Sequence, residues 1–385
     1  MIWDAIVLGA GPAGSVTAYL LARAGARVLL LEAERFPREK ICGEAFSPQA
    51  VQLLERIGVG AALAGLPRVL LRGMRLVSPN GRVLQGHYGA GVRGSGVRRL
   101  HLDAALAAAA ARAGAGLRER QRALAVLSGA GSTLEVRAKE VGGSVKVERA
   151  RFVIGAEGRK TVLGRQLGTL RYDLRYRRWA IRGHFEGVEQ LSDFAEMHVG
   201  RSRYLGICPL GKDLANVCLV GEAASLQGAR GLDQHFDRGL EEFPDLAERL
   251  RGARATGPLA AVGPLAYRVE PRPVAGTLLV GDALGFFDPF TGEGCYRAVR
   301  TAELAAQAVL AVGAGGPESR ARRGYYRRCR HEFGPKENFQ RALQRLVFPP
   351  RRAERLAALL ERFPAATDRL VQVAADLRPL WRLLF

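Results

Sequence analysis

Three glycines near the start of the chain have the spacing of a phosphate-binding turn. They follow the short apolar run at residues 4–8, and the loop that they form contains Gly9, Gly11, Pro12, Ala13 and Gly14. In a strand–turn–helix unit the first glycine permits the tight turn, the second admits a pyrophosphate, and the third allows close helix packing. The proline suits the first helical turn, where free N–H groups and the helix dipole favour negative charge. The motif therefore predicts a dinucleotide site.

An acidic residue at the end of the next expected strand supports the same conclusion. Residues 27–31 form an apolar run, and Glu32 follows it close to the spacing of a ribose-binding acid. A carboxylate at this place suits a free 2′-hydroxyl, whereas a 2′-phosphate would favour an arginine. We therefore expect FAD or NAD rather than NADP here, with Glu32 and Ala33 among the cofactor-binding residues.

The charge of the chain is its most unusual bulk property. Its 385 residues include 58 Lys and Arg against 37 Asp and Glu, so the formal net charge is +21. Three interpretations are open: an arginine-rich solvated surface, attraction to anionic lipid or an acidic substrate, and nucleic-acid binding. The basic residues are spread along the chain and no nucleic-acid module is recognised, so we expect no nucleic-acid partner.

The cysteines and the apolar runs indicate the compartment. The five cysteines are odd in number and widely spaced: Cys42, Cys208, Cys218, Cys295 and Cys329. Without a C-x-x-C pair or neighbouring histidines, they predict neither a disulfide framework nor a zinc site, and they fit a reducing compartment. The first apolar run belongs to a strand rather than a signal peptide, and no run has the ~20 apolar residues that span a bilayer. We expect a cytoplasmic protein, with peripheral membrane contact as an open alternative.

Two further glycine turns complete a set of three motifs. Residues 155–158 (GAEG), followed by Thr161 and Arg165, form the second, and residues 281–294 (GDALGFFDPFTGEG) form the third. In this order the motifs resemble those of the FAD-dependent oxidoreductase superfamily that contains p-hydroxybenzoate hydroxylase-like monooxygenases, flavin halogenases and geranylgeranyl reductases. The resemblance covers roughly residues 1–312. The second motif departs from the usual pattern, because Glu157 stands where an aspartate is usual.

The resemblance implies FAD as the cofactor and assigns residues to it. Asp282 would accept hydrogen bonds from the ribityl hydroxyls, and a helix beginning near residues 292–294 would direct its N–H groups at the flavin pyrimidine. Arg99 would approach FAD from the start of an alanine-rich helix, and Asp103, one turn on, would orient it. The cofactor-binding set expected from the resemblance is completed by Cys42, Gly43, Arg99, Gly281, Asp282, Pro289, Gly292 and Gly294. NADH, NADPH or a ferredoxin-like protein would supply electrons.

Two segments bear on the type of reaction. Lys40, Cys42 and Gly43 match a Lys-x-Cys-Gly loop that recurs in isoprenoid reductases. Those reductases also share a Tyr-x-Trp-x-Phe-Pro strand. In this chain residues 204–209 read YLGICP, so both interior aromatics of that pattern are replaced by small residues. Halogenases are disfavoured because the chain has no Trp-x-Trp-x-x-Pro pattern.

The expected function follows from the altered strand. Small residues at positions 206 and 208 would leave a wide space, which favours an NAD(P)H-dependent monooxygenase acting on an apolar aromatic or polyketide- or lipid-like substrate. A geranylgeranyl reductase-type enzyme is the alternative, and a non-catalytic basic FAD-carrying scaffold is the third. The flavin would carry the chemistry, with Cys42 and Tyr204 as candidate catalytic side chains. The expected pocket residues are Phe185, Met197, Tyr204, Ile207 and Cys208.

The resulting fold expectation is an α/β protein with a discontinuous Rossmann-like FAD-binding domain, an inserted mixed β-sheet substrate domain and C-terminal helices. An Asn80-Gly81 turn between apolar runs predicts a hairpin that begins the inserted domain. The FAD-binding domain is assigned to residues 1–73, 97–175 and 266–330. The substrate domain is assigned to the hairpin at 74–96 and to residues 176–265, and the helical segment to residues 331–385.

Overall fold

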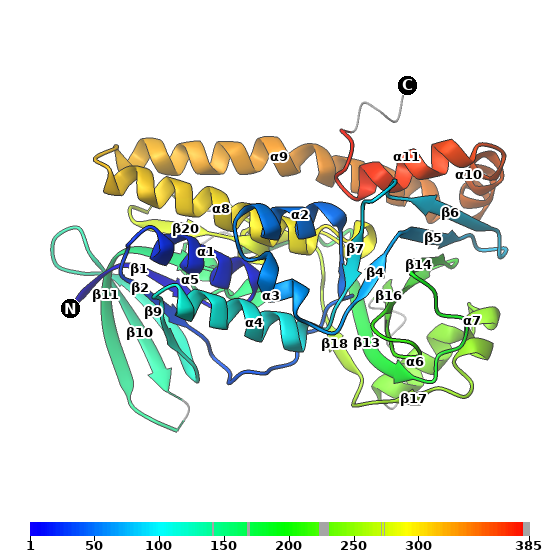
Figure 1. Ribbon diagram of the computed structural model, residues 1–385, viewed down its shortest axis with the longest axis horizontal. Helices are drawn as coiled ribbons and strands as arrows, with labels where there is room; N and C mark the ends of the chain where they lie inside the picture. Colours follow the sequence, from blue (N-terminus) through cyan, green and yellow to red (C-terminus); the bar gives the residue numbers. More distant parts are fainter. Residues whose placement is uncertain (141, 168–169, 223–230, 271, 273, 380–385) are drawn as a thin grey trace.

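The computed structural model describes residues 1–140, 142–167, 170–222, 231–270, 272 and 274–379. Figure 1 shows two sheets at opposite ends of the molecule, with helix α9 (Glu318–Val347) running along both. The expected fold class is confirmed: a Rossmann-like domain is assembled from separated segments, and a second, largely antiparallel sheet is inserted between them.

The first sheet has the strand order β8-β2-β1-β11-β10-β9, and β20 pairs with β11. Its strands are β1 (Ile2–Leu8), β2 (Val28–Leu31), β8 (Gly116–Arg118), β9 (Gln121–Ser128), β10 (Leu134–Glu140), β11 (Val145–Gly155) and β20 (Thr277–Leu279). Strand β1 runs parallel to β2 and β11, whereas β9, β10 and β11 are antiparallel. Residues 5–8 are fully buried, because parallel strands of this kind are covered on both faces.

Helices cover one face of this sheet and build the larger apolar core. They are α1 (Pro12–Arg23), α2 (Pro48–Arg56), α3 (Gly60–Ala64), α4 (Arg99–Arg112) and α8 (Gly294–Gly313), joined by part of α9. Helix α2 begins after Ser47, which accepts a hydrogen bond from the amide of Ala50 at 3.3 Å and so caps the helix. The alanine-rich α4 also forms where its composition predicts it.

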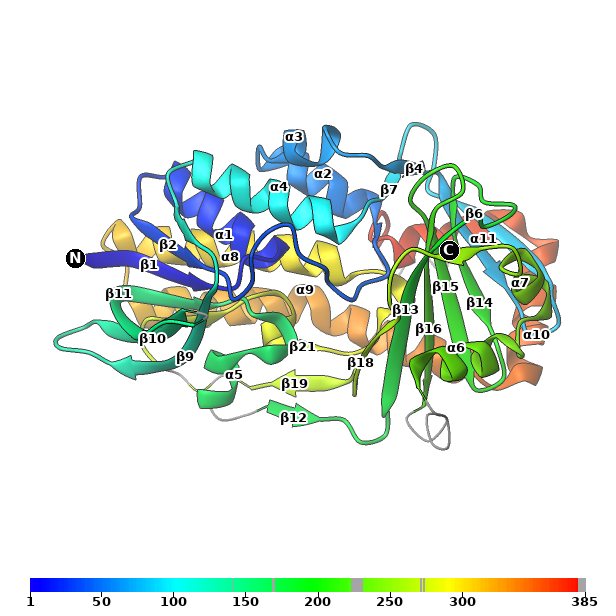
Figure 2. The same ribbon diagram turned by 90° about the horizontal axis from the view of Figure 1, so that it is seen from below.

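The second sheet has the order β17-β13-β16-β15-β14-β5-β6, with β18 paired to β13. Its strands are β5 (Gly73–Val77), β6 (Val83–His87), β13 (Arg178–Glu186), β14 (Phe194–Val199), β15 (Arg203–Pro209), β16 (Ala215–Glu222), β17 (Arg254–Ala255) and β18 (Ala260–Val262). The predicted hairpin is confirmed as β5 and β6, and β5 joins the sheet parallel to β14. Figure 2 shows α6 (Leu232–Leu240) and α7 (Pro244–Arg249) beside this sheet.

Two small sheets and three short helical segments lie around the main sheets. The sheet β3-β7-β4 consists of β3 (Ala45–Phe46), β7 (Gly94–Gly96) and β4 (Val69–Leu71). The sheet β12-β19-β21 consists of β12 (Leu170–Tyr172), β19 (Tyr267–Val269) and β21 (Gly285–Phe286). The short helical segments used below are α5 (Val162–Gln166), η3 (Gly281–Leu284) and η4 (Pro289–Thr291).

The C-terminal part consists of α9, α10 (Pro350–Arg362) and α11 (Pro364–Ala374). The domain boundary expected at residues 330/331 falls inside α9, which continues through Pro335. Phe333, Gln340 and Val347 are buried on this helix, so packing keeps it continuous where a proline would favour an end. Within the described part of the chain, the search for a helix with the length and apolarity needed to cross a bilayer finds none. The end of the expected helical segment at residues 331–385 lies outside the described residues, which stop at 379.

Candidate cofactor site and adjoining apolar cavity

The first glycine turn is built as its spacing predicts. Gly9 has φ +93°, and a Cβ on it would lie 2.7 Å from the carbonyl oxygen of Ala156. A Cβ on Gly14 would overlap the carbonyl oxygen of Gly9, so this glycine lets α1 pack on the strand. At Gly11 the nearest described atoms would be 3.9 Å away. The first and third glycines are thus required by packing, whereas the second opens onto free space at the start of α1.

Two guanidinium groups border that space. The nearest atoms to a Cβ on Gly11 are Nη2 of Arg38 and Nη2 of Arg99. Asp103 accepts hydrogen bonds from Arg99 at 2.6 and 2.8 Å and from Arg38 at 2.9 Å, and Glu32 accepts one from Arg38 at 3.1 Å. The expected orientation of Arg99 by Asp103 is therefore present. Together with the helix dipole of α1, these cations form a cradle for a pyrophosphate.

Glu32 is held at the edge of the same cradle. Its Oε2 accepts a hydrogen bond from the amide of Ala10 at 2.9 Å, and its Oε1 accepts one from the amide of Glu34 at 3.1 Å. These bonds fix a carboxylate next to the glycine loop, where a ribose hydroxyl would lie, and Ala33 is the next residue in the chain. The sequence analysis missed Arg38, whose only signal was the dense charge of the loop at residues 34–44.

The Lys-x-Cys-Gly loop packs against the first turn of α8. Cys42 and Cys295 are in side-chain contact, and a hydrogen bond with Cys295 is the main cause that lowers the pKa of Cys42 to about 6. Lys40 lies near Arg99 and Asp282, and burial lowers its pKa. The loop therefore carries a reactive thiol and an amine to the place where the third motif begins its helix. Each of the five cysteines is a free thiol.

Glu44 ties this loop to the second sheet. It adopts a left-handed conformation with φ +60°, and it accepts hydrogen bonds from His184 at 2.6 Å, Asn216 at 2.9 Å and the amide of Arg99 at 2.8 Å. Arg182 lies 3.0 Å from the other ring nitrogen of His184. Burial opposes ionisation of Glu44, but these partners hold its pKa below the usual value. The partners are distant in sequence, so no local pattern pointed to them.

The loop of the third motif is held by a buried carboxylate. Asp288 accepts hydrogen bonds from the hydroxyl of Tyr204 at 2.6 Å, the amide of Phe290 at 3.0 Å and Arg178 at 3.2 Å. Burial raises the pKa of Asp288. Tyr204 is 2% exposed and its hydroxyl is already engaged, so its position is that of a support for the loop that begins at Pro289.

The backbone at the start of α8 has free space beside it, as a bound flavin ring would require. No atom of the described chain lies within 4 Å of a Cβ built on Gly292, which has φ +72°, and the nearest to one on Gly294 is at 4.0 Å. Among the described residues, no side chain caps this helix start. Gly281 donates its amide to Thr301 at 2.8 Å and thereby fixes η3, which carries Asp282.

The second motif differs in geometry as it does in sequence. Glu157 accepts hydrogen bonds from the amide of Val162 at 2.9 Å and from the hydroxyl of Thr161 at 3.2 Å, so its carboxylate caps α5. Burial raises its pKa. The carboxylate of Glu157 is therefore used to hold the start of α5.

These features fit FAD. The space at Gly11, the two guanidinium groups and Glu32 would hold the pyrophosphate and ribose, and the open start of α8 would face the flavin pyrimidine. The residues expected to bind the cofactor come from five separate segments, and the structure gathers them along one edge of the first sheet and the starts of α1 and α8.

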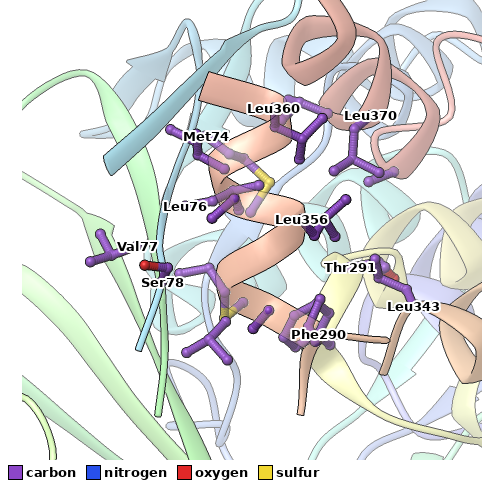
Figure 3. A pocket seen from close by; sticks show the side chains of 18 residues that line it. Met74, Leu76, Val77, Ser78, Phe290, Thr291, Leu343, Leu356, Leu360 and Leu370 are labelled. Carbon is purple, nitrogen blue, oxygen red and sulfur yellow. The ribbon is translucent and has the colours of Figure 1, made fainter. Parts of the chain in front are cut away.

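An apolar cavity of about 80 Å³ adjoins the loop of the third motif. Figure 3 shows Met74 and Leu76 of β5 facing Leu356 and Leu360 of α10, with Phe290 at one end. Among the described residues that line it, only Ser78 and Thr291 are polar. The lining is Met74, Leu76, Val77, Ser78, Leu84, Met197, Val199, Phe290, Thr291, Leu343, Val347, Ala353, Leu356, Ala357, Leu360, Leu370, Val371 and Ala374.

The structure does not bring the five expected pocket residues together. Met197 lines the cavity, and Tyr204 packs edge-on against the phenylalanine at its end. Phe185 and Ile207 point to the opposite face of the sheet, into the core under α6 and α7. Cys208 belongs to a separate cluster near β7. Successive side chains along β13 and β15 point to opposite faces of the sheet, which separates Phe185 and Ile207 from Met197 and Tyr204. The expectation had placed residues from both faces in one pocket.

The inference that small residues widen the pocket is wrong at Cys208. A Cβ on Gly96 of β7 would lie 3.0 Å from the Cys208 sulfur and would overlap the carbonyl oxygen of Pro209. The backbone of β7 therefore occupies the space that an aromatic at position 208 would fill. At Gly206 the nearest described atom would be 3.9 Å from a Cβ, an ordinary contact distance, so a small side chain would fit there.

Known proteins share this chain's sequence pattern and fold. The FAD binding domain family matches residues 3–336. Menaquinone reductase of Mycobacterium tuberculosis is 31% identical over 326 residues, which are 79% of this chain and 76% of the relative. Digeranylgeranylglycerophospholipid reductase of Thermoplasma volcanium is 26% identical over 318 residues, covering 79% and 77%.

Solved structures agree. The myxobacterial chondrochloren halogenase CndH superposes with a TM-score of 0.84 at 27% identity, over 89% of this chain and 82% of that one. The flavin-dependent brominase Bmp2 reaches a TM-score of 0.85 at 21% identity, over 97% and 94%, which shows the shared fold. With the glycine cradle, its cations and the open start of α8, these matches place the chain in the FAD binding domain family, as an FAD-dependent oxidoreductase.

Proposed function

We propose that the protein reduces a carbon–carbon double bond in the isoprenoid chain of a lipid-soluble substrate such as a prenylated quinone, with NADH or NADPH as the electron donor. The observation that carries this proposal is the apolar cavity that ends at Phe290 and Thr291, beside the loop expected to face the flavin. This reverses the order of preference drawn from the sequence, where a hydroxylase came first.

The lining of the cavity favours an apolar ligand. Its two polar side chains are hydroxyls without charge, and the other lining residues are apolar. A buried charge or several unpaired polar groups of a ligand would cost free energy in such a lining. A prenyl chain has neither. Methionines at positions 74 and 197 add adaptable walls, since their side chains fill irregular gaps.

The relatives support the same substrate class. Their names describe reduction of menaquinone and of digeranylgeranylglycerophospholipid, and both carry isoprenoid chains. The halogenase CndH resembles this chain at a similar identity, but this chain has no Trp-x-Trp-x-x-Pro pattern. The Lys-x-Cys-Gly loop at Lys40 and Cys42 also fits the reductases.

The chain's own residues bind and orient the reactants. Bound FAD would supply hydride transfer: NAD(P)H is oxidised to NAD(P)⁺, and the double bond gains that hydride and one proton. Asp288 and Tyr204 hold the loop between flavin and cavity, and the apolar walls exclude water from the reacting carbons. Cys42, whose pKa is about 6, is held by a side-chain contact with Cys295 and by a hydrogen bond from the amide of Glu44.

A hydroxylase is the second candidate, and Gly206 is the observation that favours it. Position 206 has no side chain, and a Cβ built there would make only ordinary contacts with Glu196 and Met197, so this part of β15 is less filled than an aromatic residue would leave it. The two reactions differ in their need for oxygen, because a hydroxylase inserts one atom of dioxygen and a reductase adds only two hydrogens.

One experiment separates the candidates. The FAD-loaded protein is incubated with a prenylated quinone and NADPH or NADH, both anaerobically and under labelled dioxygen, and the products are analysed by mass spectrometry. The proposal expects anaerobic turnover and a product two mass units heavier. Turnover that stops without oxygen and places a labelled oxygen atom in the product would replace it with the hydroxylase.

A further inference from the structure

Helix α10 has two apolar faces, and only one of them is covered by the protein. Ala353 and Ala357 are 6% and 4% exposed and line the cavity together with Leu356 and Leu360 (Figure 3). Leu359 is 54% exposed. Helix α10 by itself therefore separates the apolar cavity from the outside at this place.

The outward face combines large apolar side chains with arginines. Phe363, directly after the helix, is 58% exposed, and Leu359 lies one turn before it. The exposed arginines of the helix are Arg351, Arg352, Arg355 and Arg362. Arg352 also donates to the carbonyl of Arg345 at 3.5 Å, which joins the last turn of α9 and its half-exposed Leu346 to the same region.

The acidic residues of α10 do not share this face. Glu354 and Glu361 both pair with Arg82, and Glu354 also accepts a hydrogen bond from the amide of Asn80 at 2.7 Å. Both acids therefore turn to the β5–β6 hairpin, and the outer side keeps a positive charge. Figures 1 and 2 place α10 at the outer end of the molecule, so a flat surface can approach it.

We propose that the outer face of α10 docks on an anionic lipid bilayer and that the cavity receives its apolar substrate from that bilayer. Arginines would contact the anionic headgroups, while Leu359 and Phe363 would enter the boundary between headgroups and acyl chains. A lipid surface fits better than nucleic acid because half-exposed Leu and Phe gain nothing from a phosphate backbone. The inference that the substrate enters from the bilayer rests on the proposed function, whereas the inference of a docking surface does not.

The first test is flotation of the FAD-loaded protein with vesicles, which requires no activity. The protein should float with phosphatidylcholine–phosphatidylglycerol vesicles at low salt, less at high salt, and weakly with phosphatidylcholine alone. Replacing Leu359→Ser and Phe363→Ser should lower affinity by on the order of tenfold. Replacing Arg351, Arg355 and Arg362 by Gln should lower it by on the order of 100-fold at low salt, at about fivefold per arginine.

A matched control uses exposed residues elsewhere. The double variant Leu174→Ser and Arg112→Gln removes a leucine that is 64% exposed and an exposed arginine of α4, and it should bind as the wild type does. Wild-type binding by both α10 variants, or no flotation at low salt, would overturn the docking surface. Tighter binding to duplex DNA than to anionic vesicles, lost in the α10 variants, would also overturn it.

A second measurement tests delivery from the bilayer. The Leu359→Ser and Phe363→Ser variant should turn over a vesicle-embedded prenylated quinone slowly and a water-soluble short-chain analogue at the wild-type rate. Equal losses with both substrates would contradict the delivery role. If no substrate is reduced by any form but vesicle binding depends on α10, the proposed reaction fails while the docking surface stands.

Discussion

Replacing Gly11 with valine should remove FAD binding while leaving the apo-protein folded. The backbone at Gly11 has φ −74° and ψ −175°, an extended conformation that β-branched residues adopt without strain. The nearest described atoms to a new Cβ are the two guanidinium ends at 3.9 Å, an ordinary contact distance. The free energy of unfolding of the apo-protein should therefore stay within about 0.5 kcal/mol of the wild type.

The loss of cofactor affinity follows from what the side chain would displace. The valine would fill the space where a pyrophosphate approaches the N–H groups at the start of α1. Losing about two charge-assisted hydrogen bonds of ~1.5–3 kcal/mol each predicts ~3–6 kcal/mol, or a rise in Kd of roughly 10² to 10⁴-fold. The Kd is measured by quenching of FAD fluorescence, and folding of the apo-protein by circular dichroism melts.

Gly14→Ala is the matched control. Its Cβ would overlap the carbonyl oxygen of Gly9, so the apo-protein itself should lose stability, with a lower Tm and a loss of cofactor binding that follows unfolding. If Gly11→Val binds FAD with wild-type affinity, the phosphates lie elsewhere. If Gly11→Val melts as early as Gly14→Ala, the space at Gly11 is not open and the argument from packing fails.

Three further predictions concern the Cys42 thiol, a buried carboxylate paired with Arg249 of α7, and the support of the third-motif loop. In the apo-protein, alkylation of Cys42 by iodoacetamide should rise with pH around a midpoint near 6 and disappear in Cys42→Ser, and bound FAD should slow it. Burial raises the pKa of Glu196, but hydrogen bonds and ion pairs, chiefly with His198 and Arg249, outweigh it and lower the pKa to about 2. Its contribution, on the order of 3 kcal/mol, is present above the unfolded pKa near 4.5 and is lost as pH falls toward 2, so Glu196→Gln should flatten the acid side of a stability–pH curve. Tyr204→Phe removes a hydrogen bond from buried Asp288 and should lower the free energy of unfolding by about 1–3 kcal/mol in a chemical denaturation, and an unchanged value would contradict the assigned support role.

The cofactor half of the site could be predicted from sequence because its signals are local. The spacing of Gly9, Gly11 and Gly14 encodes a turn, and the structure gives Gly9 and Gly14 a steric reason, whereas Gly11 has no close neighbour in the protein. Arg99 and Asp103 lie one helical turn apart, so their pairing follows from helix geometry. The same holds for the hairpin at Asn80 and Gly81, where the turn chemistry alone predicts two strands.

The substrate half could not be predicted in this way. The expected pocket mixed Phe185 and Ile207 with Met197, although these side chains lie on opposite faces of the second sheet. Which face is covered by α6 and α7, and which by α9, α10 and α11, is decided by long-range packing. Single-strand alternation shows that two faces exist and does not say which of them holds a ligand.

The sequence by itself determined the cofactor class, the strand–turn–helix unit that binds it and the two-sheet fold, because glycine spacing, apolar runs and turn residues act over a few neighbouring positions. Only the tertiary structure decided that Glu44 joins His184 and Asn216, and that the cavity lies under α10. The physical reason is distance along the chain. Glu44 lies 140 residues from His184 and 172 from Asn216, and β5 lies far along the chain from α10, so these contacts depend on how the whole chain packs.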